Sequence, residues 1–236
     1  MRRWRARRGR SNVEREVEDL AARDPDWHRK AVGGLWDEVG RLQFRFLVEE
    51  GLRPDHDLVD IGCGSLRGGV HFVEYLERGR YAGVDVDERL LVAGREELRR
   101  RGLEGKEPLL VPTGDFDLPS LGRRFDFALA QSLFTHLPIN DIIRCLVRVD
   151  DVLEPGGRFY ATFFENPDGK RNVDPISHPT VDLPELLSYF DRDPFHYDVD
   201  TFRWMCESTR LEVAYLGEWG HPRDQRMLVF TKRADA

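Results

Sequence analysis

The sequence predicts an α/β fold, with a seven-stranded, mostly parallel sheet, helices on both faces and an antiparallel strand pair at its end. Three observations support this fold class. Short apolar runs alternate with amphipathic helical runs, as expected for β-α-β units. The first apolar run passes directly into a glycine-rich turn. The last two runs are joined by a loop without a helical pattern, which favours an antiparallel pair over another crossover.

The predicted elements follow one another in a regular order. Five runs are expected to form the parallel strands, at residues 57–61, 81–84, 109–111, 125–130 and 158–164. Helical patterns separate them at residues 69–77, 88–101 and 139–153. A helix at 201–208 precedes the antiparallel pair, placed at 211–216 and 227–231.

A helical cap is expected before the first strand. Between residues 27 and 50, apolar side chains recur at steps of three and four, which predicts an amphipathic helix with a bend at Gly33-Gly34. Gly51 ends this helix and Pro54 follows it. We therefore place a cap at residues 26–54, within a domain that spans residues 26–236.

The N-terminal segment is rich in arginine. Residues 1–10 carry six Arg around Trp4, but only four of the 36 basic residues of the chain are Lys, so Arg is its usual cation. Between residues 13 and 20 the apolar positions are sparse and allow at most a short exposed helix. We interpret residues 1–25 as a flexible tail, with binding to an anionic surface or nucleic acid as the alternative.

Residues 165–198 fit neither pattern. They contain five prolines and many polar residues, with a short helical piece expected around residues 183–189. Long loops in compact domains are usually functional, and this one directly follows the last parallel strand. The carboxyl edge of such a sheet is where ligands bind, so we predict that this segment is a substrate lid.

Composition excludes several classes of protein. With 236 residues and 40% hydrophobic content, the chain is expected to form one globular domain. No apolar run approaches the roughly 18 residues that cross a bilayer, and the N-terminus lacks the apolar core of a signal peptide. Cys63, Cys145 and Cys206 are widely separated, which argues against a disulfide scaffold or a cysteine zinc site. We expect a cytoplasmic protein, and its net charge of −7 argues against unspecific nucleic-acid binding.

The most informative segment runs from Leu58 to Gly69, where a strand passes into glycines and then a helix. A dinucleotide loop would need a third glycine at the position of Arg67, and Asp60 would place a carboxylate beside the diphosphate. An acid before the turn suits a cationic ligand, such as an ammonium or a sulfonium. The loop therefore indicates S-adenosylmethionine (SAM) rather than NAD.

Acidic residues also follow the second and third strands. Asp85 can accept hydrogen bonds from both hydroxyls of a ribose, and Asp115 can accept one from an adenine amino group while Phe116 covers the ring. A single Asp at a strand end is more often a turn or a helix cap. In this order and spacing, however, the acids together support a nucleoside-containing ligand.

With these motifs, residues 55–164 and the terminal strand pair resemble the class I (Rossmann-like) SAM-dependent methyltransferases of small-molecule type. Five segments carry the resemblance, namely residues 59–64, 84–85, 115–116, 125–131 and 153–159. The resemblance implies SAM as cofactor and S-adenosylhomocysteine (SAH) as product. The cofactor-binding residues that it implies are Asp60, Gly62, Cys63, Gly64, Arg67, Asp85, Val86, Asp115, Phe116 and Gln131.

The chain departs from the family pattern after Gly64, where Leu66 replaces a frequent glycine and Arg67 follows. Arg67 is therefore expected to reach the carboxylate of the methionine group, with a solvated residue at the helix start as the alternative.

The resemblance implies direct methyl transfer, in which the protein positions the two partners and removes a proton from a hydroxyl acceptor. His136 and His221 are the candidate bases, because both are expected in loops near the carboxyl edge of the sheet. A packed or capping histidine is the alternative for each. The candidate substrate residues are Trp36, Arg41, His178, His196 and Tyr197, and no metal site is predicted.

The absence of two motifs narrows the class of acceptor molecule. No Asp/Asn-Pro-Pro-aromatic motif follows the fourth strand, and no Pro-Cys nucleophile is present. We predict methyl transfer to an oxygen or nitrogen of a small-molecule metabolite. The alternatives are a protein or nucleic-acid methyltransferase that uses the Arg-rich tail, a non-catalytic SAM-binding module and, last, a nicotinamide-dependent oxidoreductase. The sequence does not indicate an oligomeric state.

Overall fold

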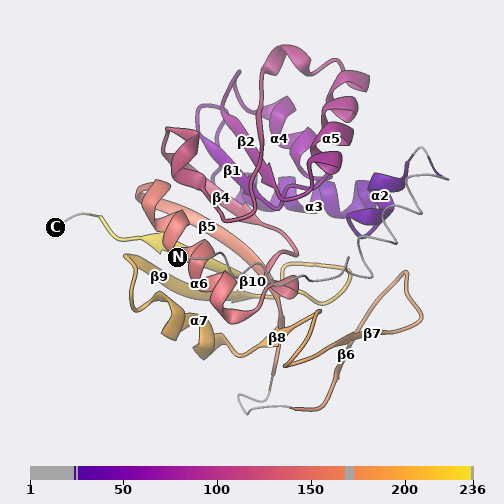
Figure 1. Ribbon diagram of the computed structural model, residues 1–236, viewed down its shortest axis with the longest axis vertical. Helices are drawn as coiled ribbons and strands as arrows, with labels where there is room; N and C mark the ends of the chain where they lie inside the picture. Colours follow the sequence, from indigo (N-terminus) through magenta and orange to yellow (C-terminus); the bar gives the residue numbers. More distant parts are fainter. Residues whose placement is uncertain (1–23, 25, 168–172, 235–236) are drawn as a thin grey trace, which may run out of the picture.

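The computed structural model describes residues 24, 26–167 and 173–234 (Figure 1). The predictions for the Arg-rich residues 1–10 and the short helix at 13–20 lie outside this part of the chain. Among the described helices, none has the length and apolar character needed to cross a bilayer. The domain limits at residues 26 and 236 stay predictions.

The central sheet confirms the predicted fold class. Seven strands lie in the order β3-β2-β1-β4-β5-β10-β9. Their bounds are Leu58–Ile61 (β1), Tyr81–Asp85 (β2), Leu109–Pro112 (β3), Phe125–Ala130 (β4), Leu153–Glu165 (β5), Leu211–Gly217 (β9) and Arg226–Lys232 (β10). The first five strands are parallel, whereas β10 and β9 add the predicted antiparallel pair.

The strand count differs by one from the prediction. The two-residue strand β8, His196–Tyr197, pairs in parallel with the end of β5 and makes the sheet eight-stranded. This strand is too short for a sequence pattern to reveal, since its pairing depends on contacts with Phe164 and Glu165.

The chain order creates a switch point between β1 and β4. From β1 the chain proceeds outward to β2 and β3, then returns to β4 on the other side of β1. In open α/β sheets, ligands bind at the carboxyl ends of the strands at such a point.

Helices cover both faces of the sheet (Figure 1). One apolar cluster joins the strands to α3 (Trp36–Glu49), α4 (Gly69–Tyr75) and α5 (Glu88–Arg100). The other joins them to α6 (Ile139–Val152) and α7 (Val199–Cys206). Short 3₁₀ turns lie at Glu104–Lys106 (η1), Leu118–Leu121 (η2) and Phe134–His136 (η3).

The cap, residues 26–54, holds two helices rather than the single bent helix that was predicted. The first, α2, spans Trp27–Ala31 and is separated from α3 by Gly33, Gly34 and Leu35, which all have positive φ angles of 44° to 91°. Such backbone angles cannot continue a right-handed helix, so the glycines end it rather than bend it.

The segment predicted to be a lid, residues 165–198, contains a hairpin where a short helix was predicted, and its role as a lid stays a prediction. Strand β7, Leu186–Ser188, pairs with β6, Ile176–His178, in a separate two-stranded sheet. The helix prediction around 183–189 is therefore wrong. An isolated helix of about seven residues has little stability of its own, so the pairing with distant residues prevails.

Candidate active site

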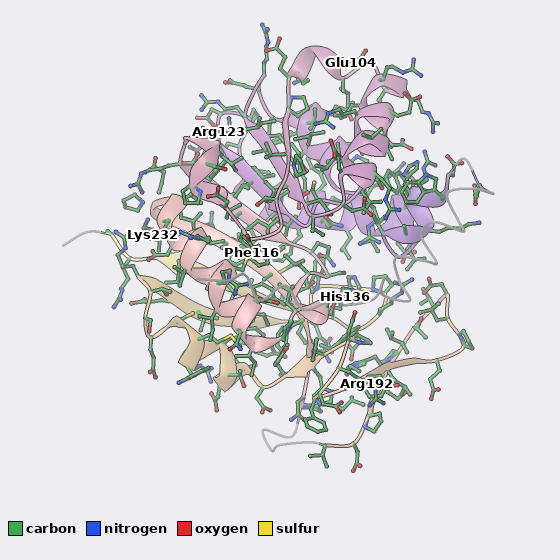
Figure 2. All side chains as sticks on the ribbon, viewed as in Figure 1. Glu104, Phe116, Arg123, His136, Arg192 and Lys232 are labelled. Carbon is green, nitrogen blue, oxygen red and sulfur yellow. The ribbon has the colours of Figure 1, made fainter. Side chains whose placement is uncertain are left out.

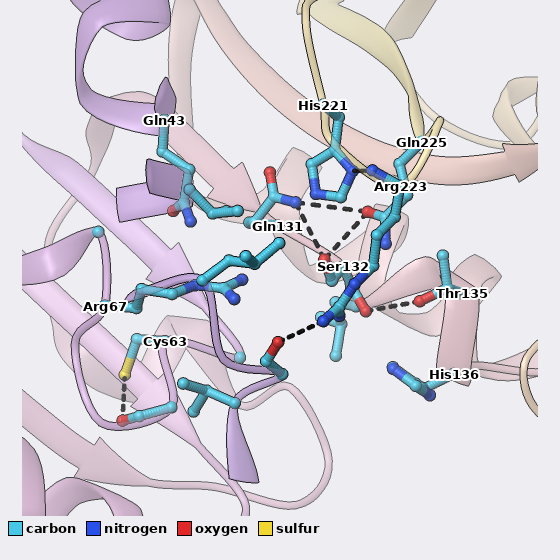
Figure 3. A pocket seen from close by; sticks show the side chains of 18 of the residues that line it. Gln43, Cys63, Arg67, Gln131, Ser132, Thr135, His136, His221, Arg223 and Gln225 are labelled. Atoms are coloured by element: carbon cyan, nitrogen blue, oxygen red, sulfur yellow. Dashed lines mark hydrogen bonds between the residues drawn. The ribbon is translucent and has the colours of Figure 1, made fainter. Parts of the chain in front are cut away.

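A cavity of about 400 Å³ opens at the carboxyl edge of β1, β2 and β4. The cap, the lid and the loop before β10 (residues 218–225, the final loop) each contribute to its lining. Nine of the predicted site residues meet there, and Figure 3 shows several of them. They are Asp60, Gly62, Cys63, Gly64, Arg67, Asp85, Gln131, His136 and His221.

The glycine loop after β1 forms the floor of this cavity. Gly62 and Gly64 have φ angles of 71° and 55°, which other residues rarely adopt. A Cβ atom on Gly64 would lie 2.6 Å from Cγ1 of Val32, and one on Gly62 would lie 3.1 Å from Cδ1 of Leu133. The loop is therefore packed between the cap and the segment after β4, and only glycine leaves room for a ligand against its backbone.

Two carboxylates flank the glycine loop. Asp60 is buried and accepts a hydrogen bond from the Tyr81 hydroxyl at 2.8 Å. Burial raises the pKa of Asp60 to about 7, and the Asp85 carboxylate adds to the shift, while the bond from Tyr81 opposes it. Asp85 accepts hydrogen bonds from the backbone N–H groups of Gly64 and Asp87, each at 2.9 Å, and burial raises its pKa as well.

Two arginines converge on the turn between the cap helices. Arg67 donates to the carbonyl of Gly34 at 3.0 Å, and Arg223 donates to the carbonyl of Gly33 at 2.6 Å. Burial, with the nearby charge of Arg223, lowers the pKa of Arg67 to about 10, so it remains a cation at neutral pH. Arg223 also pairs with Asp182 of the lid.

Sequence reasoning missed Arg223. The only available signal was its place beside His221 in the final loop, and its partners lie 41 and 190 residues away.

A cluster of polar side chains lies directly after the end of β4. The side-chain oxygen of Gln225 accepts from Thr162 at 2.7 Å. It also accepts from Ser132 at 3.0 Å and from Gln131 at 3.3 Å (Figure 3). Gln131 is buried, and its Oε1 has no hydrogen-bond partner among the described residues. A buried carbonyl oxygen without a partner is costly, so this atom is suited to accept from a ligand.

These features fit SAM. A positively charged ligand suits the neighbourhood of Asp60 and Asp85, its carboxylate suits Arg67, and the glycine backbone allows close approach. The unpartnered oxygen of Gln131 offers an acceptor for its ammonium group.

His221 lies in the final loop, where its ring stacks on Trp219 with a centroid distance of 5.5 Å. Its Nδ1 accepts the backbone N–H of Arg223 at 3.2 Å, so the neutral ring carries its proton on Nε2. Burial and the charges of Arg67 and Arg223 lower its pKa to about 3. His221 is therefore a neutral hydrogen-bond donor rather than a ready proton acceptor.

His136 lies at the other side of the cavity, at the end of η3. Its Nδ1 is 2.6 Å from Oδ1 of Asp193 in the lid, and its side chain is 57% exposed. The two predicted bases therefore differ in their surroundings, since His136 has a carboxylate partner and contact with solvent.

Three of the predicted cofactor residues lie outside the cavity lining. Val86 is 77% exposed directly after β2, and Asp115 is exposed after β3. Phe116 has a φ angle of 52° and packs against the α6 and α7 side of the core. Their proposed contacts with an adenosine group stay predictions.

The predicted substrate residues also lie outside the lining. Trp36 is buried in the cap, where it contacts His28 edge to face and lies under the Arg29 guanidinium, and Arg41 is exposed on α3. His178 and His196 are buried in the lid, and both contact the Ser188 hydroxyl, at 2.6 and 3.1 Å. The Tyr197 hydroxyl donates to the carbonyl of Leu137 at 2.6 Å.

One group of metal-ligand side chains exists away from the cavity. Oxygen or nitrogen atoms of Asp26, His28 and Glu97 lie within 4.8 Å of one another, and no other such group occurs in the described part of the chain. Arg29 binds both carboxylate oxygens of Glu97, at 2.8 to 3.1 Å, and already compensates its charge.

Sequence comparisons show that this chain is similar to methyltransferases. Residues 59–159 match a family model described as a methyltransferase domain. The chain is 26% identical over 183 residues to a protein from Vibrio vulnificus named ubiquinone/menaquinone biosynthesis C-methyltransferase UbiE. That match covers 73% of this chain and 65% of the relative, so the chain spans less than two-thirds of the relative's length.

Solved structures share the fold. A SAM-dependent methyltransferase from Clostridium acetobutylicum matches with a TM-score of 0.64 at 14% identity, over 92% of this chain and 99% of that one. Magnesium protoporphyrin IX methyltransferase from Synechocystis, solved with bound SAM, matches with a TM-score of 0.58 at 13% identity, over 95% and 86%. The predicted fold class therefore agrees with both sequence and structure comparisons.

Proposed function

The chain belongs to the class I SAM-dependent methyltransferase family, and from that premise we propose that it transfers a methyl group from SAM to a small-molecule metabolite. The observation that carries this proposal is the glycine loop between Asp60 and Asp85, which opens into a cavity at the switch point of the sheet. SAM would supply an electrophilic methyl group on a sulfonium, and the protein would supply position and proton removal.

On the cofactor side, each polar group has a proposed partner. Asp60 and Asp85 would face the cationic and ribose parts of SAM, and Arg67 its carboxylate. Gln131 would accept from the ammonium group through its unpartnered oxygen. Val86, Asp115 and Phe116 would border the adenine at the outer edge of β2 and β3, where Val86 is well exposed.

On the acceptor side, the lid and the final loop lie over the cavity through Leu186, Pro194 and His221. Such an enclosure favours a small acceptor over a polymer. Among the predicted substrate residues, His178, His196 and Tyr197 would support the lid through their hydrogen bonds, and Trp36 would support the cap through its ring contact with His28. Arg41, exposed on α3, would act from the outer face of the cap.

For the methylated atom we propose an oxygen or nitrogen. The name of the Vibrio vulnificus relative favours carbon as the second candidate, because that protein is called a C-methyltransferase. Mass spectrometry of a methylated product, with the methyl position assigned by NMR, would distinguish the three atoms.

A cytoplasmic location is proposed with this function. Cys63, Cys145 and Cys206 are buried free thiols, as a reducing compartment allows. A protein or nucleic-acid acceptor recruited by residues 1–10 is the competing proposal. Deletion of that segment should then weaken acceptor binding strongly and in a salt-dependent way, whereas a small acceptor predicts little change.

Calorimetry tests the proposed cofactor. The purified full chain should bind SAM and SAH, and D85N should weaken both because it removes a carboxylate acceptor beside the glycine loop. NAD titrated under the same conditions is the matched control and should not bind. Binding of NAD without binding of SAM would overturn the proposal. SAM binding without SAH formation from any metabolite extract would instead indicate a non-catalytic binding module.

A further inference from the structure

The lid segment at residues 193–197 is hydrogen-bonded to the turn that carries His136. The backbone N–H of Phe195 donates to the carbonyl of Thr135 at 2.6 Å, and the Tyr197 hydroxyl donates to the carbonyl of Leu137 at 2.6 Å. These two hydrogen bonds lie on either side of His136 in the sequence. In Figure 2, Arg192 lies in the lid below His136.

Between these two anchors, Asp193 meets the imidazole. Its Oδ1 lies 2.6 Å from Nδ1 of His136. A carboxylate can only accept, so Nδ1 carries the proton and the lone pair of the neutral ring lies on Nε2. His136 also lines the cavity, as does Pro194, the residue after Asp193.

The second histidine of the cavity lining, His221, carries its ring proton on the other nitrogen. The Nδ1 atom of His221 accepts a backbone N–H, so its Nε2 carries the proton and cannot accept another. Of the two histidines in the cavity lining, His136 is therefore the one whose unoccupied nitrogen can take a proton.

From this geometry we propose that Asp193 is a positioning residue that makes His136 the general base, and that the acceptor carries a hydroxyl group. The inference rests on the proposed methyl transfer and deepens it. A neutral hydroxyl is a poor nucleophile and gains from a base, whereas a neutral amine is a stronger nucleophile and can attack before it loses a proton.

The proposed step moves one proton and one methyl group. The acceptor O–H proton passes to Nε2 of His136, the oxygen lone pair forms the bond to the methyl carbon, and the pair of the broken carbon–sulfur bond stays on sulfur. The resulting imidazolium is stabilised by the Asp193 carboxylate. Because His136 is half-exposed, the proton can then leave to water.

The test uses the full chain with three variants. H136Q removes the base, D193N removes the carboxylate that orients it, and D191N is the matched control. Asp191 carries a carboxylate two residues before Asp193 in the lid, and this carboxylate pairs with Arg192. SAM binding is measured by calorimetry for the wild type and for each variant. If the wild type does not bind SAM, the proposed function is wrong. If it binds SAM, the two readouts below test this inference alone.

The first readout is the ¹⁵N chemical shifts of the His136 ring in the SAH complex. We expect a protonated Nδ1 and an unprotonated Nε2 in the wild type and D191N, and loss of this preference in D193N. A proton on Nε2 in the wild type, or shifts that D193N leaves unchanged, would overturn the proposal.

The second readout is SAH formation with phenol and aniline as matched probes, which differ only in the attacking group. With phenol, H136Q should lower kcat by about 100-fold or more and D193N by about tenfold, with unchanged KM for SAM. Transfer to aniline should change little. Transfer to aniline but not phenol, or equal kcat values for D193N and D191N with phenol, would contradict the proposal. If neither probe is methylated, the ring-nitrogen shifts decide alone.

Discussion

At the scale of single residues, the pocket depends on carboxylates and glycines placed where other side chains would be costly. Asp60 is buried beside the cavity with the Tyr81 hydroxyl as its hydrogen-bond donor. The ionisation of a buried carboxyl group with a pKa of about 7 responds to a positively charged ligand, because the ligand stabilises the ionised form.

Cofactor binding should therefore depend on pH through Asp60. Since the pKa of Asp60 is raised to about 7, SAM affinity should increase as the pH rises from about 6 to about 8, by at most about tenfold per unit. Calorimetry across this range provides the measurement. D60N should bind SAM weakly, without this pH dependence, and an unchanged slope in D60N would assign the titration to another group.

The same shift has a consequence for folding. The folded state of Asp60 binds a proton more tightly than the unfolded chain, in which the carboxyl has its ordinary pKa of 3.8. The free energy of unfolding should thus fall as the pH rises from 3.8 through about 7, and D60N should lack this contribution.

The glycine loop makes a second residue-scale prediction. G64A introduces both a positive φ angle on alanine and a Cβ atom 2.6 Å from Val32. The free energy of unfolding should fall by more than the roughly 1 to 2 kcal/mol of the backbone term, with loss of SAM binding. The matched control is G79A, where φ is 77° and no atom lies within 4 Å of the new Cβ.

Urea unfolding compares the two alanine variants. G79A should show the backbone cost alone, and V32A added to G64A should recover the part that comes from the clash. Equal decreases in the free energy of unfolding of G64A and G79A would mean that the contact with Val32 does not affect stability.

At the scale of elements, the cavity is enclosed by three segments far apart in the chain. Arg223 of the final loop joins them, because it bonds to Gly33 of the cap and pairs with Asp182 of the lid. Arg67, two residues before the start of α4, adds a hydrogen bond to the carbonyl of Gly34. The break between α2 and α3 thus supplies the two carbonyl groups on which the arginines converge.

Loss of this connection should speed ligand release. R223A should raise the SAH dissociation rate about fivefold, which corresponds to ~1 kcal/mol, and D182A should raise it less because the bond to Gly33 remains. Stopped-flow fluorescence of Trp219, which stacks near the site on His221, can follow the release. D200A removes an ion pair with Arg203 on α7 and serves as the control, with an unchanged rate.

At the scale of the whole molecule, one sheet separates two apolar layers. The layer under α6 and α7 is rich in aromatic rings, and Phe202 lies within it, fully buried and in contact with Phe134, Phe163 and Tyr197. Phe134 begins the turn that ends at His136. This layer therefore supports the acceptor side of the cavity.

Truncation in this layer should be strongly destabilising. F202A should lower the free energy of unfolding by about 3 to 5 kcal/mol, since it leaves a cavity among packed rings. F190A, in the lid, removes a side chain that is 41% exposed and should change it by about 0.5 kcal/mol or less. Urea unfolding of both variants is the measurement, and a small effect of F202A would contradict the role assigned to this layer.

Sequence reasoning succeeded where neighbours in the chain carry the signal. The parallel strands and the helices between them follow from local periodicity, and the turn at Gly62 and Gly64 follows from their position at a strand end. It failed for the lid hairpin and for the partners Asp193, Arg223 and Gln225. Their contacts join residues 8 to 190 positions apart, which no local pattern records.

The sequence by itself therefore determined the α/β architecture, the glycine loop and the acids around it, because each depends on residue type and spacing within a short segment. Only the tertiary structure decided which side chains share the cavity and in what protonation state. It brought Asp193 to His136, and Arg223 to Gly33 and Asp182, and it gave the two histidines opposite ring protons. The reason is physical, since hydrogen-bond geometry and burial depend on distances in space that the chain order does not contain.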